Sequence, residues 1–118
     1  MTPVVALGVA VAGGVGAVAR LLLDGVVSDR AGRGLPLGTL VVNLSGAFLL
    51  GLLVGLAPGG DALEVAGTGL LGGYTTFSTW MFESHRLAED GRGRWALANL
   101  VGALVLGLAA VALGRALG

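Results

Sequence analysis

The chain has 118 residues, of which 55% are hydrophobic and only 12% are charged, and its mean hydropathy is +0.92. A soluble domain carries charge on about a quarter of its residues, so this composition excludes an ordinary soluble domain and predicts an integral membrane protein. Seven basic and seven acidic residues cancel to a net charge of zero, which argues against nucleic acid as a partner. Cysteine is absent, which excludes disulfides and thiolate metal sites.

Four apolar runs are long enough to cross a bilayer as helices, which takes about 20 residues each. They cover residues 3–23, 35–56, 62–84 and 95–117, and the connections between them are short and either polar or rich in glycine. The first run lacks the basic start of a secretory signal and is too long for its apolar core, so we interpret it as a retained membrane helix. We therefore predict that residues 1–118 form a single all-α membrane domain surrounded by lipid.

Polar residues inside the first two runs need an explanation, because a polar group in hydrocarbon is costly unless it is paired or faces water. Arg20 lies one turn before Asp24, and we expect an ion pair between them at the membrane edge. The second run opens with Pro36 and carries Thr39 and Asn43 on one helical face. Asn43 fits either a hydrogen bond between helices or a donor that lines a solute path, and spacing alone does not choose between them.

The third run contains LGGYTTFSTW at residues 71–80, which places glycines and hydroxyls where an apolar helix is expected. Gly72 and Gly73 each weaken a helix by roughly 1 kcal/mol relative to alanine, and the hydroxyls can bond backbone groups in a non-helical turn. Broken backbone at membrane depth is tolerated only where it is buried in protein or lines a cavity, and its carbonyls can hold a small cation. We therefore predict a helix that is broken at residues 72–76, near the middle of the membrane and at a functional centre. Phe77 and Trp80 follow on one helical face.

The remaining polar positions and the glycines concern helix ends and packing. Glu83, three residues before Arg86, is interpreted as an interfacial acid at the end of the third run, and the fourth run carries Asn99. Glycines recur at small-xxx-small spacing, as at Gly51 and Gly55, which favours close approach of helices in lipid. Four helices form a thin bundle with little interior, so we expect an oligomer.

Three motifs resemble those of the fluoride channel family, called Fluc or CrcB. GGYTTFSTWMFE (72–83) resembles the family signature GGxTTFSTFxxE. PLGTLVVNLSGAFLLG (36–51) is similar to the second-helix motif GTxxxNxxGxFxxG, and GGVGAVARLLL (13–23) to the first-helix motif GGxxGAxxRxxx. The resemblance covers all four runs, with the motifs in the right order. It implies a channel, not an enzyme, that passively exports fluoride across the plasma membrane of a prokaryote.

The resemblance also implies an assembly and a role for each matching residue. Two four-helix subunits would pack antiparallel, with fluoride pores at their interface. The positions that match the lining of the pore are Thr39, Asn43, Phe77 and Trp80. Gly72 and Thr75 would offer backbone carbonyls to a structural Na⁺ that the subunits share and do not transport, while Arg20 and Glu83 match positions near the vestibules. The chain departs from the family pattern at Trp80, where phenylalanine is usual, and in its fourth run, where a hydroxyl track is replaced by apolar residues.

Other classes of function fit the residues less well. A small multidrug exporter depends on a carboxylate in its first helix, and no acidic residue precedes Asp24. An intramembrane enzyme needs a Ser/His pair or a metal cluster at depth, and the four runs contain neither. The alternative that stays open is a non-conducting or accessory subunit of a heterodimeric fluoride channel, because Trp80 and the apolar fourth run depart from the pattern.

The loop charges predict an orientation. The first and third connections carry five arginines, and the terminal side carries one: Arg30, Arg33, Arg86, Arg92 and Arg94 against Arg115. Arginines in short loops favour the cytoplasm, so both termini are expected outside. An antiparallel homodimer needs a chain that inserts both ways. We therefore expect a second, homologous subunit of opposite bias, with a homodimer as the alternative.

Overall fold

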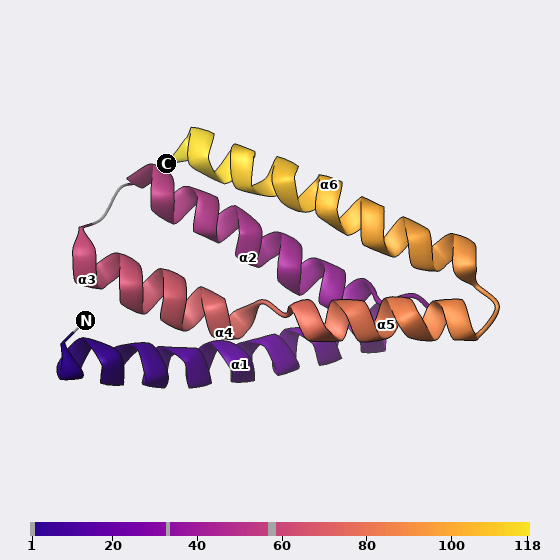
Figure 1. Ribbon diagram of the computed structural model, residues 1–118, viewed down its shortest axis with the longest axis horizontal. Helices are drawn as coiled ribbons and strands as arrows, with labels where there is room; N and C mark the ends of the chain where they lie inside the picture. The colour runs from indigo at the N-terminus through magenta and orange to yellow at the C-terminus, as the bar shows by residue number, and fades with distance from the viewer. Residues whose placement is uncertain (1, 33, 57–58) are drawn as a thin grey trace.

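The computed structural model describes residues 2–32, 34–56 and 59–118. These residues form α1 (Pro3–Ala31), α2 (Leu37–Leu56), α3 (Gly60–Leu63), the π-helix η1 (Glu64–Leu71), α4 (Gly72–Tyr74), α5 (Phe77–Glu89) and α6 (Gly93–Leu117). In Figure 1 the termini and the start of α3 lie at one end, and the α1–α2 and α5–α6 connections lie at the other. The chain therefore runs back and forth along a molecule 48 Å long.

Helix α1 is longer than the sequence predicts. It begins at Pro3, where the Thr2 hydroxyl accepts a hydrogen bond from the Val5 N–H at 3.2 Å, and it continues to Ala31. The prediction that this helix ends at residue 23 is wrong, because polarity marks the edge of the membrane and not the end of the helix. The polar residues that follow simply extend the helix until Gly32, whose φ of +86° closes it.

Helices α2 and α6 form the most extensive packing in the molecule, and their bounds agree with the predicted runs 35–56 and 95–117 to within two residues. They approach so closely that side chains would collide. A Cβ added to Gly51 would lie 2.2 Å from the Val111 carbonyl oxygen, and one added to Gly114 would lie 2.1 Å from the Phe48 carbonyl oxygen. Small residues at these positions allow direct backbone contact, as membrane helix pairs require.

The segment from residue 60 to residue 89 is not one continuous helix. Thr75 (φ −83°, ψ 158°) and Thr76 (φ −145°, ψ 118°) are extended and separate α4 from α5. Gly72 and Gly73, which we expected to be unwound, are helical. The reason is that Gly73 lets α4 pack directly on the backbone of α1, since a Cβ at this position would lie 2.2 Å from the Gly13 carbonyl oxygen. The non-helical residues are thus the two threonines alone.

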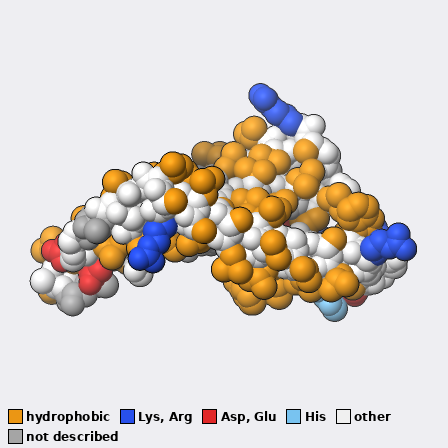
Figure 2. Space-filling model, turned by 90° about the horizontal axis from the view of Figure 1, so that it is seen from above, with side chains coloured by type: hydrophobic (Ala, Val, Ile, Leu, Met, Phe, Trp, Pro, Cys, Tyr) orange, Lys and Arg blue, Asp and Glu red, His pale blue; other side chains and the backbone are white. Residues whose placement is uncertain are grey.

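The exterior is apolar and the interior is small. Within the described residues, Val42 is the only large side chain that is fully buried, whereas Leu7, Leu104 and Leu108 are more than half exposed. The chain exposes 7016 Å², against about 5,800 Å² for a compact soluble monomer of this mass. Figure 2 shows apolar side chains across most of the visible face. Helices α1, α2 and α6 are each long and apolar enough to cross a membrane, and the prediction of an all-α membrane fold is confirmed.

Candidate functional site

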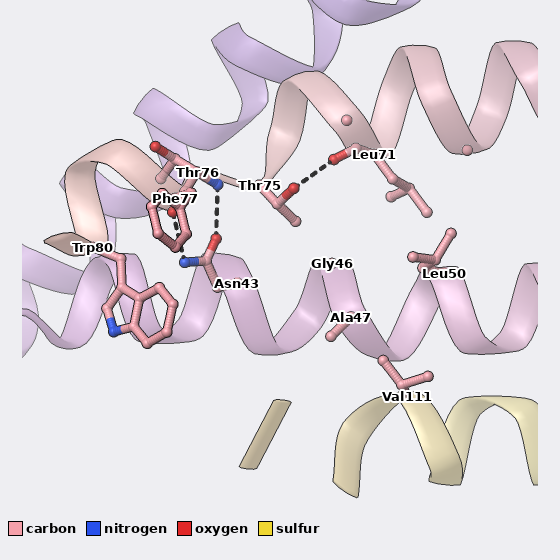
Figure 3. A pocket seen from close by; sticks show the side chains of 12 residues that line it. Asn43, Gly46, Ala47, Leu50, Leu71, Thr75, Thr76, Phe77, Trp80 and Val111 are labelled. Atoms are coloured by element: carbon pink, nitrogen blue, oxygen red, sulfur yellow. Dashed lines mark hydrogen bonds between the residues drawn. The ribbon is translucent and has the colours of Figure 1, made fainter. Parts of the chain in front are cut away.

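An open groove of about 380 Å³ lies beside the two extended threonines, between α2 and the segment that faces it. Figure 3 shows its lining from α2, the end of η1, the break and the start of α5. Its lining residues share one property, the absence of formal charge: Asn43, Gly46, Ala47, Leu50, Gly67, Leu71, Gly72, Thr75, Thr76, Phe77, Trp80 and Val111. The sequence-predicted residues Asn43, Gly72, Thr75, Phe77 and Trp80 are therefore brought together in one place.

Asn43 is bonded to the break itself. Its Nδ2 donates to the Thr76 carbonyl oxygen at 2.9 Å, and its Oδ1 accepts from the Thr76 N–H at 2.9 Å (Figure 3). One side chain thus satisfies both backbone groups of a non-helical residue, groups that would be costly to leave unpaired in an apolar surrounding. The hydrogen bond between helices is formed, and because an amide has two N–H donors, one stays available to the groove.

The threonine hydroxyls close the two helix ends on either side of the break. Thr75 donates both its N–H and its Oγ1–H to the Leu71 carbonyl oxygen, each at 3.0 Å. Thr76 caps α5, where its Oγ1 accepts from the Thr79 N–H at 3.3 Å. The prediction that these hydroxyls bond backbone groups is confirmed for both residues, whereas Ser78, in the same cluster, is exposed.

The break also changes what the Gly72 carbonyl can bind. In a continuous helix the Thr76 N–H would donate to Gly72. Here the Thr76 N–H donates to Asn43 instead, so Gly72 loses its helical donor. The Gly72 residue is exposed, Thr75 has an extended backbone, and both line the groove. Main-chain oxygens freed in this way are the hard donors that a small cation such as Na⁺ takes, so these two residues fit the expected ion.

Phe77 and Trp80 form an aromatic pair on the groove. Their ring centroids are 5.6 Å apart and the planes meet at 84°, an edge-to-face arrangement. Phe77 is 69% exposed, so most of its ring has no neighbour in this chain. The indole Nε1 of Trp80 points to α6, where it donates to the Asn99 carbonyl oxygen at 3.1 Å. The groove therefore meets ring carbons and not the indole N–H.

Thr39 lies outside the groove. It is buried, and its hydroxyl donates to Glu83 Oε1. Both Thr39 and Asn43 face the third segment, as their shared helical face predicts, but one turn separates them and they meet different residues. Glu83 borders a second cavity of about 580 Å³ at the end of the molecule where α1 meets α2. Thr76 of the groove and Thr79 of this cavity are joined by a hydroxyl–hydroxyl hydrogen bond of 3.2 Å.

The expected ion pair between Arg20 and Asp24 is not formed in the described structure, and that prediction is wrong. Asp24 instead accepts a hydrogen bond from the Ser28 hydroxyl at 3.3 Å, one turn further along α1. The Nε of Arg20 is buried with no hydrogen-bond partner among the described residues. Arg86, expected beside Glu83 at the interface, lies 5.9 Å from the centroid of the Phe82 ring.

Sequence reasoning missed the partners that orient the aromatic residues. Tyr74 shares a hydrogen bond of 2.8 Å with Ser45 of α2. Ser84 joins Asn99 to the backbone of Trp80 through bonds of 2.7 and 2.8 Å. The signal for Ser84 was its position one turn after Trp80 on a predicted helix, where a serine hydroxyl reaches the carbonyl four residues back.

Comparisons with known proteins agree with this geometry. The family model described as CrcB-like protein, Camphor Resistance (CrcB), matches residues 7–115. The fluoride-specific ion channel FluC 2 of Mycolicibacterium paratuberculosis is 57% identical over 116 residues, which cover 98% of this chain and 95% of the relative. FluC 2 of Mycobacterium bovis is 53% identical over 115 residues, covering 98% and 91%. FluC 1 of Leifsonia xyli subsp. xyli is 51% identical over 122 residues, covering 100% and 89%.

These relatives align over nearly the whole chain, so the similarity extends over the sequences of all its helices. Helices α1, α2 and α6, with the apolar exterior, make the chain a multi-pass protein of the plasma membrane. The matched family model covers all but the first six and the last three residues. The chain belongs to the CrcB family.

Proposed function

We propose that this chain is a subunit of a fluoride-selective ion channel that lets fluoride leave the cytoplasm passively. The observation that carries the proposal is the groove beside the break, which combines amide and hydroxyl groups with aromatic edges and contains no charged side chain. The printed names of its relatives, fluoride-specific ion channels, support the choice of ion.

The chemistry of the groove suits a small, strongly hydrated anion. Fluoride must exchange its water for donors, and the free N–H of Asn43 is one such donor. The edges of Phe77 and Trp80 carry partial positive charge and add weaker attraction. A pore must also release its ion, and a fixed cation in the groove would hold fluoride too tightly for conduction. We assign Thr39 to the same path at the Glu83 end, and Arg20 to a vestibule.

The pore requires a second subunit, because the groove is open on one side and much of Phe77 is uncovered. We propose an antiparallel dimer in which the partner closes the groove. Gly102 and Gly107 of α6 support this arrangement, since a Cβ at either would meet no atom within 4 Å. The break between α4 and α5 lies about midway along the molecule in Figure 1, which corresponds to the middle of the membrane. The arginine bias of the connections favours a homologous partner of opposite orientation over a second copy.

We assign the Gly72 and Thr75 carbonyls to a structural Na⁺ at the dimer interface. When bound, the ion supplies positive charge that offsets oxygens turned toward one another across the interface. The contribution of this chain is to free the Gly72 carbonyl through the bond between Thr76 and Asn43, and to fix Thr75 in an extended conformation.

Fluoride efflux from liposomes tests the proposal. One preparation contains this chain alone. A second contains it with a copy in which Arg30 and Arg94 become serine and arginines are added at both termini, so that both orientations are present. We expect fluoride efflux and chloride retention from at least one preparation. Efflux only from the second supports a partner of opposite orientation, efflux from the first establishes a homodimer, and two silent preparations contradict the proposed function.

A further inference from the structure

A closed ring of three hydrogen bonds ties α5 to α6 around Trp80. The Trp80 indole N–H donates to the Asn99 carbonyl oxygen at 3.1 Å, the Asn99 Nδ2 donates to the Ser84 Oγ at 2.7 Å, and the Ser84 hydroxyl donates to the Trp80 carbonyl oxygen at 2.8 Å. The ring starts and ends at the same residue, so it fixes both the backbone and the side chain of Trp80. Ser84 is 4% exposed, which shields these bonds from competing water or lipid headgroups.

We propose that Asn99 and Ser84 are positioning residues that set the orientation of the Trp80 ring, and through it the width and chemistry of the groove. This rests on the proposed function in one respect, the assignment of the groove to fluoride. The Trp80 N–H is occupied by α6 and so is not a donor to the anion. What it provides is a fixed ring whose edge, together with that of Phe77, lines the groove.

The proposal also gives α6 a role that its side chains do not show directly. Val111 is the only α6 residue in the groove lining, and it is apolar. The polar side chain of Asn99 faces α5 and not the groove. Helix α6 therefore affects the proposed fluoride path indirectly, by holding the indole of Trp80. This contact does not need a row of hydroxyl side chains along α6.

Because Trp80 meets Phe77 edge to face, the orientation of the indole decides whether its edge points into the groove. At 84° between planes, rotation of Trp80 about its side-chain bonds would move its edge either into the groove or away from it. Phe77 has no comparable anchor: it is 69% exposed. Of the two aromatic residues, Trp80 is therefore the one that the chain itself holds in place, before any partner subunit binds.

The fluorescence of Trp80 tests the proposal independently of conduction. In a Trp95→Phe background Trp80 is the sole tryptophan, and Trp95 is exposed and outside the groove. Asn99→Ala and Ser84→Ala both keep the Asn99 carbonyl oxygen that accepts from the indole, but each removes the link through Ser84 that holds this carbonyl against α5. Each should therefore increase quenching of Trp80 by acrylamide about twofold and lower its anisotropy. The double variant should add little to either single variant, because each breaks the same ring. Ser78→Ala removes an exposed hydroxyl from the same helix and should change nothing.

Fluoride efflux from the same variants supplies the functional readout. We expect Asn99→Ala and Ser84→Ala to slow efflux severalfold, and the Asn99→Ala loss to shrink in a Trp80→Phe background, which has no indole to hold. Unchanged quenching and anisotropy in both single variants would overturn the proposal. Increased quenching of Trp80 with an unchanged rate of fluoride efflux would overturn it as well. If the Trp95→Phe parent conducts no fluoride either alone or with the copy of opposite orientation, the proposed function fails, and the quenching comparison still decides whether the indole is held.

Discussion

Helix α2 contacts α6 and the broken third segment by opposite means. Helices α2 and α6 meet backbone to backbone at Gly51 and Gly114, and no polar side chain is needed there. At its break the third segment instead depends on side-chain hydrogen bonds at Thr75 and Thr76, with Asn43 of α2 as the central partner. Added volume is costly where two backbones touch, whereas a lost hydrogen bond is costly where the helix is broken. The first region provides a rigid support, and the second provides the exposed polar backbone that a pore requires.

The largest effect is expected from added volume between α2 and α6. Gly51→Val places its side chain about 2 Å from the Val111 carbonyl oxygen, and backbone cannot move aside as a flexible side chain can. We expect no monodisperse protein in size-exclusion chromatography after detergent extraction. Gly14→Val is the matched control, because a Cβ at Gly14 meets no atom within 4 Å. A folded Gly51→Val protein would show that the two helices are not in backbone contact.

The next largest effect is expected at Asn43. Asn43→Ala leaves the Thr76 N–H and carbonyl without their partner, at about 2 kcal/mol for the pair in a partly buried place, and it removes the proposed fluoride donor. We expect fluoride efflux to fall at least about tenfold, with a lower unfolding temperature. Asn43→Asp keeps the acceptor for the Thr76 N–H but turns a carboxylate oxygen toward the Thr76 carbonyl oxygen and adds a charge, so it should be no more stable than Asn43→Ala and should conduct as poorly. Efflux at the parent rate in Asn43→Ala would exclude the residue from the pore.

These two variants also separate what a sequence can and cannot predict. The glycine spacing predicted close helix packing at Gly51, because small residues are a local feature of each helix, but it did not predict that α6 is the partner. The break was predicted over residues 72–76 and occupies only Thr75 and Thr76, since Gly73 packs against Gly13 of α1 and a contact with a distant helix is not visible in local spacing. The end of α1 was missed by eight residues because helix and membrane end at different places.

The site was predicted in part for the same reason. The convergence of Asn43, Phe77 and Trp80 could be predicted because the motifs that carry them resemble those of a known family. The structure brings the three residues to one groove. Thr39 shares a helical face with Asn43, yet four residues of helix span about 6 Å, enough to place it on Glu83 instead. The role proposed for Asn99 depends in part on its carbonyl oxygen, which every residue has, so the residue type could signal only its second bond, from Nδ2 to Ser84.

Sodium removal is expected to act on the broken segment and to spare the helix pair. With potassium as the only cation, the proposed site at the Gly72 and Thr75 carbonyls loses an ion of matching size, and the dimer should loosen. We expect efflux to fall severalfold and to return when sodium is restored. The helical content by circular dichroism should not change, because α2 and α6 pack without the ion. Equal efflux in sodium and potassium would contradict the assignment of these carbonyls.

The smallest effect is expected within Thr75, where the hydroxyl and the methyl group have separate tasks. The hydroxyl donates to the Leu71 carbonyl oxygen at 3.0 Å and helps to end α4. The methyl group lies over Gly46 of α2, so close that a Cβ there would be 2.3 Å from it. Thr75→Ser keeps the hydrogen bond and should cost under about 1 kcal/mol, whereas Thr75→Val keeps the shape and loses about 1 kcal/mol or more with the bond. We therefore expect thermal unfolding to rank the parent first, Thr75→Ser second and Thr75→Val last, with the proposed sodium site unchanged in all three. The reverse order of the two variants would mean that packing on α2, and not hydrogen bonding, holds the break, and the contrast between the two regions would then disappear at this residue.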